Sequence, residues 1–241
     1  MIVSESDVQR AAAAYDAMAD AYAADVEDNA YNALYERPAL IALLPAVAGR
    51  RVLEAGCGSG PLTAWLVDNG AEVVAFDASP RQLKLARRRG LRSASFVAAD
   101  LSAPLDFLDD DAFDIVVAGL VLHYCKDWVA PLREIRRVLK PGGVVALSTH
   151  HPAWDIALSP SPNYFATELV RDTWSKGGRD YEVTFWRRPL SAMFRAIAQA
   201  GFRVDRLAEP QPRPECRVRF PEAWEQLTTR PTFLFFRLTP L

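Results

Sequence analysis

Between residues 50 and 149, short apolar runs alternate with amphipathic segments, and this alternation constrains the fold more than any other feature. Runs rich in Val, Ile, Leu and Ala predict buried strands, and the segments between them carry apolar residues at helical spacing. The predicted strands are residues 51–55, 71–77, 94–98, 113–119 and 144–149. Continuous apolar strands separated by helices are typical of a parallel sheet covered on both faces. The sequence therefore predicts an α/β fold with a doubly wound sheet.

The flanking segments differ in character, and we expect them to belong to the same domain, residues 1–241. Residues 1–49 are rich in helix formers and predict an N-terminal helical lid over the core of residues 50–149. Residues 150–189 are rich in aromatics and proline, with a predicted hairpin around Lys176-Gly177-Gly178. About 40 residues rarely support their own core, so we expect an inserted cap. Residues 190–241 predict a helix and two strands.

The composition narrows the possible partners. There are 30 acidic and 28 basic side chains, so no basic excess is available to bind a nucleic-acid backbone. No apolar run approaches the roughly 20 residues that span a bilayer, and the acidic N-terminus does not resemble a signal peptide. Cys57, Cys125 and Cys216 are too scattered for a disulfide framework or a metal cluster. We expect a cytoplasmic protein that binds neither nucleic acid nor membrane.

A glycine-rich loop follows the first predicted strand and opens a helix. It reads Glu54-Ala55-Gly56-Cys57-Gly58-Ser59-Gly60, with a glycine at every second position. Such spacing lets a ligand approach the backbone at a helix N-terminus, although a tight strand-to-helix turn is the simpler alternative. The dinucleotide fingerprint has two residues between its last glycines, and a P-loop needs a Lys-Ser/Thr pair. The loop matches neither motif.

Acidic residues end the next two predicted strands. Asp77 stands 23 residues after Glu54, where a carboxylate can accept both hydroxyls of a ribose. Asp100 stands another 23 residues on, where a carboxylate can accept the exocyclic amine of an adenine. Each acid alone is as easily a helix N-cap or a solvated loop residue. Three acids at the carboxyl ends of three strands, where such sheets bind ligands, favour a nucleoside site.

These motifs together resemble the class I S-adenosylmethionine-dependent methyltransferases. The resemblance covers residues 50–149 and extends to an N-terminal motif typical of the small-molecule group. The segments that carry it are Val52–Gly60, Asp77-Ala78-Ser79, Ala99-Asp100-Leu101, Phe113-Asp114-Ile115-Val116, Leu139-Lys140-Pro141-Gly142-Gly143 and Tyr15-Asp16-Ala17-Met18-Ala19-Asp20-Ala21-Tyr22. The resemblance implies a Rossmann-like, seven-stranded sheet whose last strand is antiparallel. It also implies S-adenosylmethionine as cofactor and S-adenosylhomocysteine as product.

The resemblance also implies which residues contact the cofactor. They come from the N-terminal helix and from the carboxyl ends of the first four strands. The implied contacts are Gly56, Gly58 and Gly60 to the methionine part, Glu54 to its ammonium group, Asp77 to the ribose, Ala78 and Leu101 beside the adenine, Asp100 to its amine, Gly119 or Leu120 through a backbone carbonyl, and Tyr15 and Tyr22 closing over the site.

Histidine is the natural general base near neutral pH, and the chain has three, all after the fourth and fifth predicted strands. A base is needed only if the methyl acceptor arrives protonated. His151 is the preferred catalytic base and His123 the second choice; His123 could instead be a packed residue at the start of the next helix. No carboxylate lies at metal-ligand spacing beside His150-His151, so no metal is predicted.

The aromatic segment predicts an apolar chamber for the methyl acceptor. The predicted acceptor-binding residues are His150, Trp154, Tyr164, Trp174 and Trp186. At least half of such aromatics are expected to form the cap's own small core instead.

The predicted function is methyl transfer to an oxygen or nitrogen of a small metabolite. A protein that only binds S-adenosylmethionine, or that uses it without methylating, is the main alternative. The glycine spacing and Asp100 disfavour a nicotinamide-dependent oxidoreductase. A macromolecular methyltransferase would need a basic face or a recognition domain. The acceptor and the choice between monomer and homodimer are left open.

Overall fold

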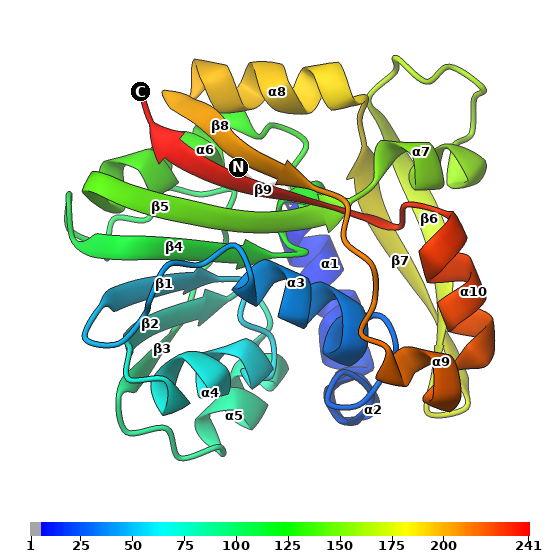
Figure 1. The fold of residues 1–241 in the computed structure, drawn as a ribbon, viewed down its shortest axis with the longest axis horizontal. Coiled ribbons are helices and arrows are strands. Elements are labelled where there is room, and N and C mark those ends of the chain that lie inside the picture. Colours follow the sequence, from blue (N-terminus) through cyan, green and yellow to red (C-terminus); the bar gives the residue numbers. More distant parts are fainter. Residues whose placement is uncertain (1–5) are drawn as a thin grey trace, which may run out of the picture.

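The computed structural model describes residues 6–241, so the first five residues of the predicted lid lie outside it. Its centre is a seven-stranded sheet (Figure 1). The strands are β1 (Arg51–Ala55), β2 (Glu72–Asp77), β3 (Ala94–Ala98), β4 (Phe113–Gly119), β5 (Leu139–His150), β8 (Phe202–Ala208) and β9 (Phe233–Pro240). Their order is β3-β2-β1-β4-β5-β9-β8, and β9 runs antiparallel to both of its neighbours. The predicted Rossmann-like sheet with an antiparallel last strand is confirmed.

Helices cover both faces of the sheet, because successive strand residues point to opposite sides. The helices are α1 (Asp7–Ala17), α2 (Ala19–Asp25), α3 (Arg37–Ile41), α4 (Pro61–Asp68), α5 (Pro80–Arg87), α6 (Val129–Val138), α8 (Leu190–Gln199), α9 (Glu215–Arg219) and α10 (Pro221–Thr229). Val116 of β4 belongs to a core shared with α1, α6 and α8. Val117 belongs to the opposite core, shared with α3, α4, α5, α9 and α10. No helix within residues 6–241 is long and apolar enough to cross a membrane.

The N-terminal segment is helical, but the alanine-rich stretch of residues 11–24 is divided between two helices. Ser6 and Gln9 form a capping box at the start of α1, and the chain breaks at Met18 before α2. A π-helical turn, Asn32–Glu36, then leads into α3. In Figure 1, α1 and α2 lie beside the edge toward which β4 and β5 point. The carboxyl ends of the parallel strands therefore face the N-terminal helices.

A second, two-stranded sheet lies beyond this edge. The hairpin predicted from residues 167–186 is present as β6 (Glu168–Lys176) and β7 (Arg179–Arg187). It follows a short helix, α7 (Pro152–Asp155), which begins where β5 ends. The buried side chains Val170, Val183 and Phe185 join the hairpin to the core that contains α1. The hairpin and the N-terminal helices thus enclose the same edge of the main sheet.

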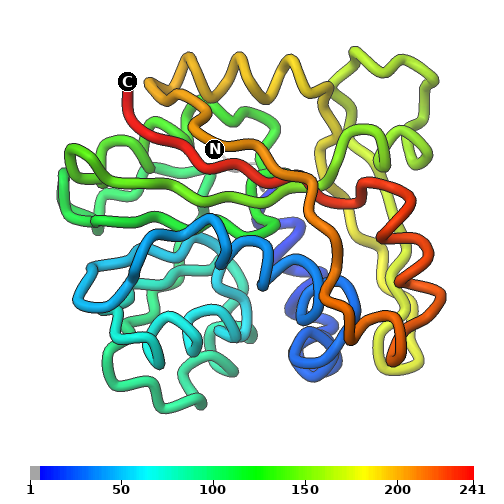
Figure 2. The backbone as a smooth tube through the Cα atoms, viewed as in Figure 1, coloured from blue at the N-terminus to red at the C-terminus, as the bar shows by residue number. Residues whose placement is uncertain are grey.

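Two parts of the chain differ from the predicted boundaries. β5 begins at Leu139, which pairs with Phe113, and the next four residues bulge out before Val144 pairs with Ile115. The strand predicted at residues 144–149 therefore begins at Leu139 and includes the Lys140-Pro141-Gly142-Gly143 segment. The short helices α9 and α10 were not predicted. Figure 2 shows the segment after β8 descending toward α9, and on the way the amide of Arg213 bonds the carbonyl of Leu34 at 2.8 Å.

Candidate functional site

The glycine loop connects β1 to α4 with left-handed backbone at three positions. The φ angles are 75° at Gly56, 53° at Gly58 and 80° at Gly60, which glycine adopts without strain. A Cβ at Gly56 would lie 2.6 Å from Cγ2 of Val121, so no side chain fits there. Gly56 and Gly58 line a cavity beneath α1, whereas Gly60 caps α4 and lies against Ala86.

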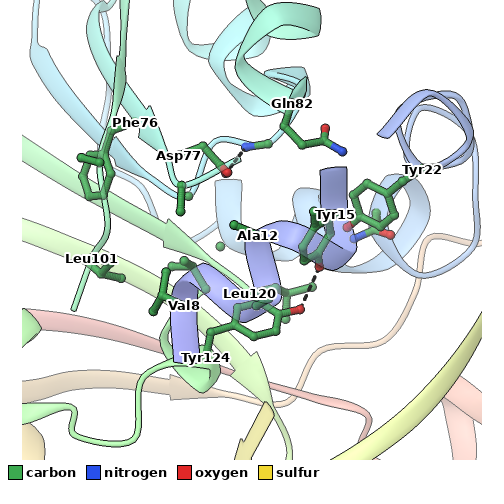
Figure 3. Close-up of a pocket in the computed structure, with 18 of the residues that line it drawn as sticks. Val8, Ala12, Tyr15, Tyr22, Phe76, Asp77, Gln82, Leu101, Leu120 and Tyr124 are labelled. Atoms are coloured by element: carbon green, nitrogen blue, oxygen red, sulfur yellow. Dashed lines mark hydrogen bonds between the residues drawn. The ribbon is translucent and has the colours of Figure 1, made fainter. Parts of the chain in front are cut away.

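This cavity, which we call the cofactor cavity, lies between the glycine loop, the end of β2 and α1. Figure 3 shows Val8, Ala12 and Tyr15 of α1 across it from Asp77 and Leu101. Of the residues predicted to bind the cofactor, those that line it are Tyr15, Tyr22, Gly56, Gly58, Asp77, Ala78, Leu101, Gly119 and Leu120. The structure therefore brings together residues from five separate segments of the chain.

Backbone amides hold the carboxylate of Asp77 in place. Oδ2 accepts from the amide of Gly58 and Oδ1 from that of Ser79, each at 2.8 Å. Burial raises the pKa of this carboxyl despite these bonds. Beside it, the buried side chain of Gln82 lines the cavity, and neither of its amide atoms has a hydrogen-bond partner among the described residues. Gln82 was not predicted at the site, because it lies in a helix with an ordinary amphipathic pattern, α5.

Asp100 does not line the cofactor cavity. Its Oδ2 accepts a 2.5 Å bond from the hydroxyl of Ser6, the residue that caps α1. Its Oδ1 accepts from the amide and hydroxyl of Ser102, at 2.7 and 2.6 Å. In this structure the carboxylate predicted to bind the adenine amine instead fastens the start of the N-terminal lid.

Two buried glutamates border an adjoining compartment that also contains Arg37. Glu54, at the end of β1, accepts a 2.6 Å bond from the hydroxyl of Thr63, and burial raises its pKa to about 8. Glu36 accepts a 2.6 Å bond from Ser148, and burial raises its pKa to about 7. The sequence analysis missed Glu36 and Arg37. A charged pair inside the apolar stretch of residues 34–44 is the signal that could have found them.

The end of β4 lies where these spaces meet. Gly119 borders both the cofactor cavity and the glutamate compartment, and a Cβ there would lie 3.2 Å from Oε1 of Glu36. Leu120 has a φ of 48°, and its amide bonds the carbonyl and hydroxyl oxygens of Ser148 at 3.1 and 3.0 Å. These bonds fix the turn that leads from β4 toward the histidines.

Tyrosines form the wall between the cofactor cavity and a second cavity. The hydroxyls of Tyr15 and Tyr124 lie 2.8 Å apart, as Figure 3 shows, and burial raises the pKa of both. Tyr22 packs edge-on against Tyr15 and stacks on Trp174 of the hairpin, with ring centroids 4.9 and 6.3 Å apart. All three tyrosines line both cavities, so the two cavities meet at this wall.

The second cavity, which we call the acceptor cavity, has a volume of about 330 Å³. It is lined by aromatic rings and by neutral hydrogen-bonding groups, with one acid and one lysine. Its walls are Tyr15, Tyr22, Asn29, Tyr31, Asn32, Leu120, His123, Tyr124, His150, Trp154, Asp172, Trp174, Ser175, Lys176, Gln226, Thr232 and Phe233. His123, His150, Trp154 and Trp174 were predicted at the acceptor; Asn32 and Gln226 were not.

Two predicted acceptor residues lie elsewhere. The hydroxyl of Tyr164 accepts a 3.2 Å bond from the amide of Leu190. The indole of Trp186 donates a 2.9 Å bond to Asp7 at the start of α1, and the ammonium of Lys126 lies over its ring. Neither side chain lines the acceptor cavity. They join the aromatic segment to α8 and to α1.

The three histidines have different surroundings. His151 caps α7: its Nδ1 accepts from the amide of Ala153 at 3.1 Å, and its Nε2 lies 2.9 Å from Glu209. Both ring nitrogens are thus occupied, and His151 lines neither cavity. His123 is buried, and neither of its ring nitrogens has a hydrogen-bond partner among residues 6–241. Its ring stacks on that of His150 with centroids 4.2 Å apart, and burial holds its pKa well below 6.5. Among the histidines, His123 and His150 line the acceptor cavity.

No three or more His, Cys, Asp or Glu side chains of residues 6–241 gather as a metal-binding group. The chain is similar to known methyltransferases.

Residues 53–147 match a family model described as a methyltransferase domain. The chain is 33% identical over 212 residues to a malonyl-[acyl-carrier protein] O-methyltransferase of Salmonella typhimurium, covering 83% of this chain and 82% of that protein. The chain belongs to the class I S-adenosylmethionine-dependent methyltransferases.

Other methyltransferases agree with this assignment. A ubiquinone biosynthesis O-methyltransferase of Xanthomonas oryzae is 36% identical over 126 residues, covering 52% of this chain and 49% of that protein. The chain spans about half the length of several of the curated relatives that it matches. A solved S-adenosylmethionine-dependent methyltransferase from Mesorhizobium loti is 29% identical, with a TM-score of 0.66 over 83% of this chain and 95% of that one.

Proposed function

We propose that this methyltransferase transfers a methyl group from S-adenosylmethionine to a hydroxyl oxygen of a small aromatic molecule. One observation carries the proposal. The two cavities meet at Tyr15, Leu120 and Tyr124, and the acceptor side presents two histidines to an aromatic-walled space. A neutral hydroxyl must lose its proton as it is methylated, and an imidazole beside it can take that proton. The names of both relatives given above also state transfer to oxygen.

The cofactor-side residues fit S-adenosylmethionine, which carries sulfonium and ammonium charges as well as a carboxylate. Burial raises the pKa of the Glu36, Glu54 and Asp77 carboxyls, so a positive charge beside them would stabilise their ionised forms. We assign Asp77 and the unpartnered amide of Gln82 to the ribose hydroxyls, and Arg37 to the carboxylate of the cofactor. When bound, S-adenosylmethionine supplies an electrophilic methyl group. The protein holds this methyl group in place and positions the acceptor beside it.

Alignment and exclusion of water are the remaining tasks in a methyl displacement. We assign them to the N-terminal lid, residues 6–49, and to the cap, residues 150–189. Asp16 of the lid bonds the hydroxyl of Ser79, and Lys176 of the cap bonds Asp25 of the lid at 2.6 Å. With the stacked rings of Tyr22 and Trp174, these contacts hold the lid and the cap together beside the junction of the cavities.

The acceptor cavity favours a hydroxyl over a carboxylate. None of the described residues that line it is an arginine, and its lysine, Lys176, is already paired with Asp25. A substrate carboxylate would therefore meet no free cation there. The amides of Asn32 and Gln226 and the hydroxyl of Thr232 suit neutral polar groups, and Trp154 and Phe233 suit an aromatic ring.

A methyl-transfer assay tests this proposal. The protein is incubated with S-adenosylmethionine and, one at a time, with catechol, 3,4-dihydroxybenzoate, 4-hydroxybenzaldehyde, malonate and aromatic amines. Mass spectrometry measures S-adenosylhomocysteine and the methylated product. We expect O-methylation of at least one hydroxylated ring. Transfer only to the amines or to malonate, or no turnover of any hydroxylated ring, would overturn the proposal.

A further inference from the structure

His150, the last residue of β5, faces a buried carboxylate that no other observation explains. Nδ1 of His150 lies 3.4 Å from Oδ1 of Asp155, the last residue of α7. Neither atom has a hydrogen-bond partner among the described residues, and the Asp155 side chain is only 3% exposed. A buried polar atom without a partner destabilises the folded state. These two atoms satisfy each other only if Nδ1 carries a hydrogen directed at the carboxylate.

A hydrogen on Nδ1 directed at Asp155 would leave Nε2 of His150 as an acceptor. His150 lines the acceptor cavity, and none of the described residues bonds its Nε2. His151 next to it has the opposite arrangement, because its Nδ1 accepts from an amide and its Nε2–H faces Glu209. The chain therefore holds two neighbouring histidine–carboxylate pairs of opposite tautomer, and only the His150 pair lies at the acceptor cavity.

His150 and His123 have different charged groups beside them. The ring of His123 stacks on that of His150 with centroids 4.2 Å apart. The ring of Phe185 packs edge-on against His150 with centroids 4.3 Å apart. Asp155 is the acid beside His150, whereas Arg188 acts on His123 and disfavours its protonation. The other charged side chains of the cavity, Asp172 and Lys176 of β6, bond Trp174 and Asp25.

We propose that His150 is the catalytic base of methyl transfer, that Asp155 is the positioning residue that orients it, and that His123 stays neutral as its stacking neighbour. This inference rests on the proposed O-methylation. The acceptor oxygen bonds the methyl carbon while its hydroxyl proton passes to Nε2 of His150. The carbon–sulfur bond breaks and leaves its electron pair on sulfur, which becomes a neutral thioether. The imidazolium releases its proton to water after the product leaves.

Nitrogen-detected NMR of the ligand-free full chain tests the tautomer without any acceptor. With three histidines in the chain, each ring can be assigned by single substitution. With the rings neutral, we expect His150 in the Nδ1–H form and His151 in the Nε2–H form, and Asp155→Ala should remove the preference at His150 alone. An Nε2–H form at His150 would overturn the inference. Because no substrate is present, this result is independent of the proposed function.

Kinetics tests the role, with the best hydroxylated ring of the assay above as acceptor. His150→Ala should lower kcat at least 100-fold. Asp155→Asn should lower kcat about 10–100-fold, leave KM for S-adenosylmethionine unchanged, and move the acidic limb of the pH–rate profile to lower pH, because the imidazolium loses its counter-ion. Asp155→Glu should restore part of kcat. The matched control is Glu209→Gln, which alters the other histidine–carboxylate pair and should change kcat less than twofold.

Two results separate the possible failures. If Asp155→Asn keeps the wild-type rate and pH profile while His150→Ala is inactive, the positioning role of Asp155 is wrong. If His150→Ala retains full activity, the base assignment is wrong although O-methylation stands. Binding of S-adenosylmethionine and the melting temperature check that each variant folds, and Asp155→Glu serves if Asp155→Asn does not.

Discussion

The cofactor cavity and the acceptor cavity share a wall but are built differently. The cofactor cavity is made mostly by backbone at strand ends: Gly56 and Gly58 with left-handed φ, and Asp77 held by two amides. The acceptor cavity is made by side chains from scattered elements, such as Trp174 of β6, Gln226 of α10 and His150 of β5. Backbone geometry restricts which residue fits at a position, whereas a side-chain wall can be built in many ways. The residues that line the first cavity can therefore be predicted from sequence better than those that line the second.

Their charges differ as well. The cofactor side concentrates buried carboxyls with raised pKa, which suits a cationic ligand. On the acceptor side, charged groups are paired within the protein, as in Lys176 with Asp25 and His150 with Asp155. The cofactor side thus offers buried carboxyls whose ionised form a cationic ligand would stabilise, and the acceptor side offers neutral hydrogen-bonding groups.

The backbone basis of the cofactor cavity is tested most severely at Gly56. Gly56→Ala combines left-handed strain with a 2.6 Å contact to Val121, and we expect it to cost about 3 kcal/mol of stability and to abolish S-adenosylmethionine binding. Gly90→Ala is the matched control, because Gly90 also has a positive φ but nothing within 4 Å. It should cost about 1 kcal/mol and leave binding intact. Thermal unfolding and calorimetry measure both; equal effects would show that strain alone matters.

Asp77→Ala should weaken S-adenosylmethionine binding by about 2 kcal/mol, or roughly 30-fold, because charge-assisted hydrogen bonds to the ribose are lost. KM for the acceptor should not change. Asp68→Ala, at the exposed end of α4, is the control and should bind as the wild type does. Unchanged affinity in Asp77→Ala would remove the ribose assignment.

The buried carboxyls predict a pH dependence of the ligand-free protein. The folded-state pKa of Glu54 is about 8, above its ordinary value of 4.5, so the folded state holds a proton that the unfolded state has lost. The free energy of unfolding should therefore fall as pH rises from 6.5 through 8.5, by about 2 kcal/mol. Glu54→Gln should flatten most of this fall. Melting temperatures across that range measure it, and identical slopes for the two proteins would contradict the prediction.

The smallest expected effect separates two residues that the sequence could not distinguish. Trp154→Ala should raise KM for the acceptor several-fold, at a cost of about 1 kcal/mol, and leave S-adenosylmethionine affinity unchanged. Tyr164→Phe should change neither value, because the Tyr164 hydroxyl bonds only the amide of Leu190 among the described residues. Steady-state kinetics against both substrates checks this; equal loss in the two variants would mean that the cap acts as one unit.

The same difference between backbone and side-chain construction limits what can be predicted from sequence. β1, β3 and β4 have the predicted bounds because apolar runs end at glycine or acidic turns. The break at Met18 and the π-helical turn at Asn32–Glu36 had no local signal, since alanine-rich and apolar helical sequence continues through both. They depend on packing against the sheet edge and the hairpin.

The histidines show the same limit at the site. His150 and His151 are adjacent, and sequence favoured the second as base. In a strand, neighbouring side chains point to opposite sides, so one ring reaches the acceptor cavity and the other caps α7. Which side faces the cavity depends on the pairing of His150 with Phe233, which lies 83 residues further along the chain. Asp155 could not be chosen from sequence for the same reason.

The most direct measurement is a calorimetric titration of the purified protein with S-adenosylmethionine, S-adenosylhomocysteine and NAD. The account predicts that both sulfur nucleosides bind at micromolar concentrations, that Asp77→Ala weakens both, and that NAD does not bind. Binding of NAD, or no binding of either sulfur nucleoside, would contradict the assignment of the cofactor cavity and of everything built beside it.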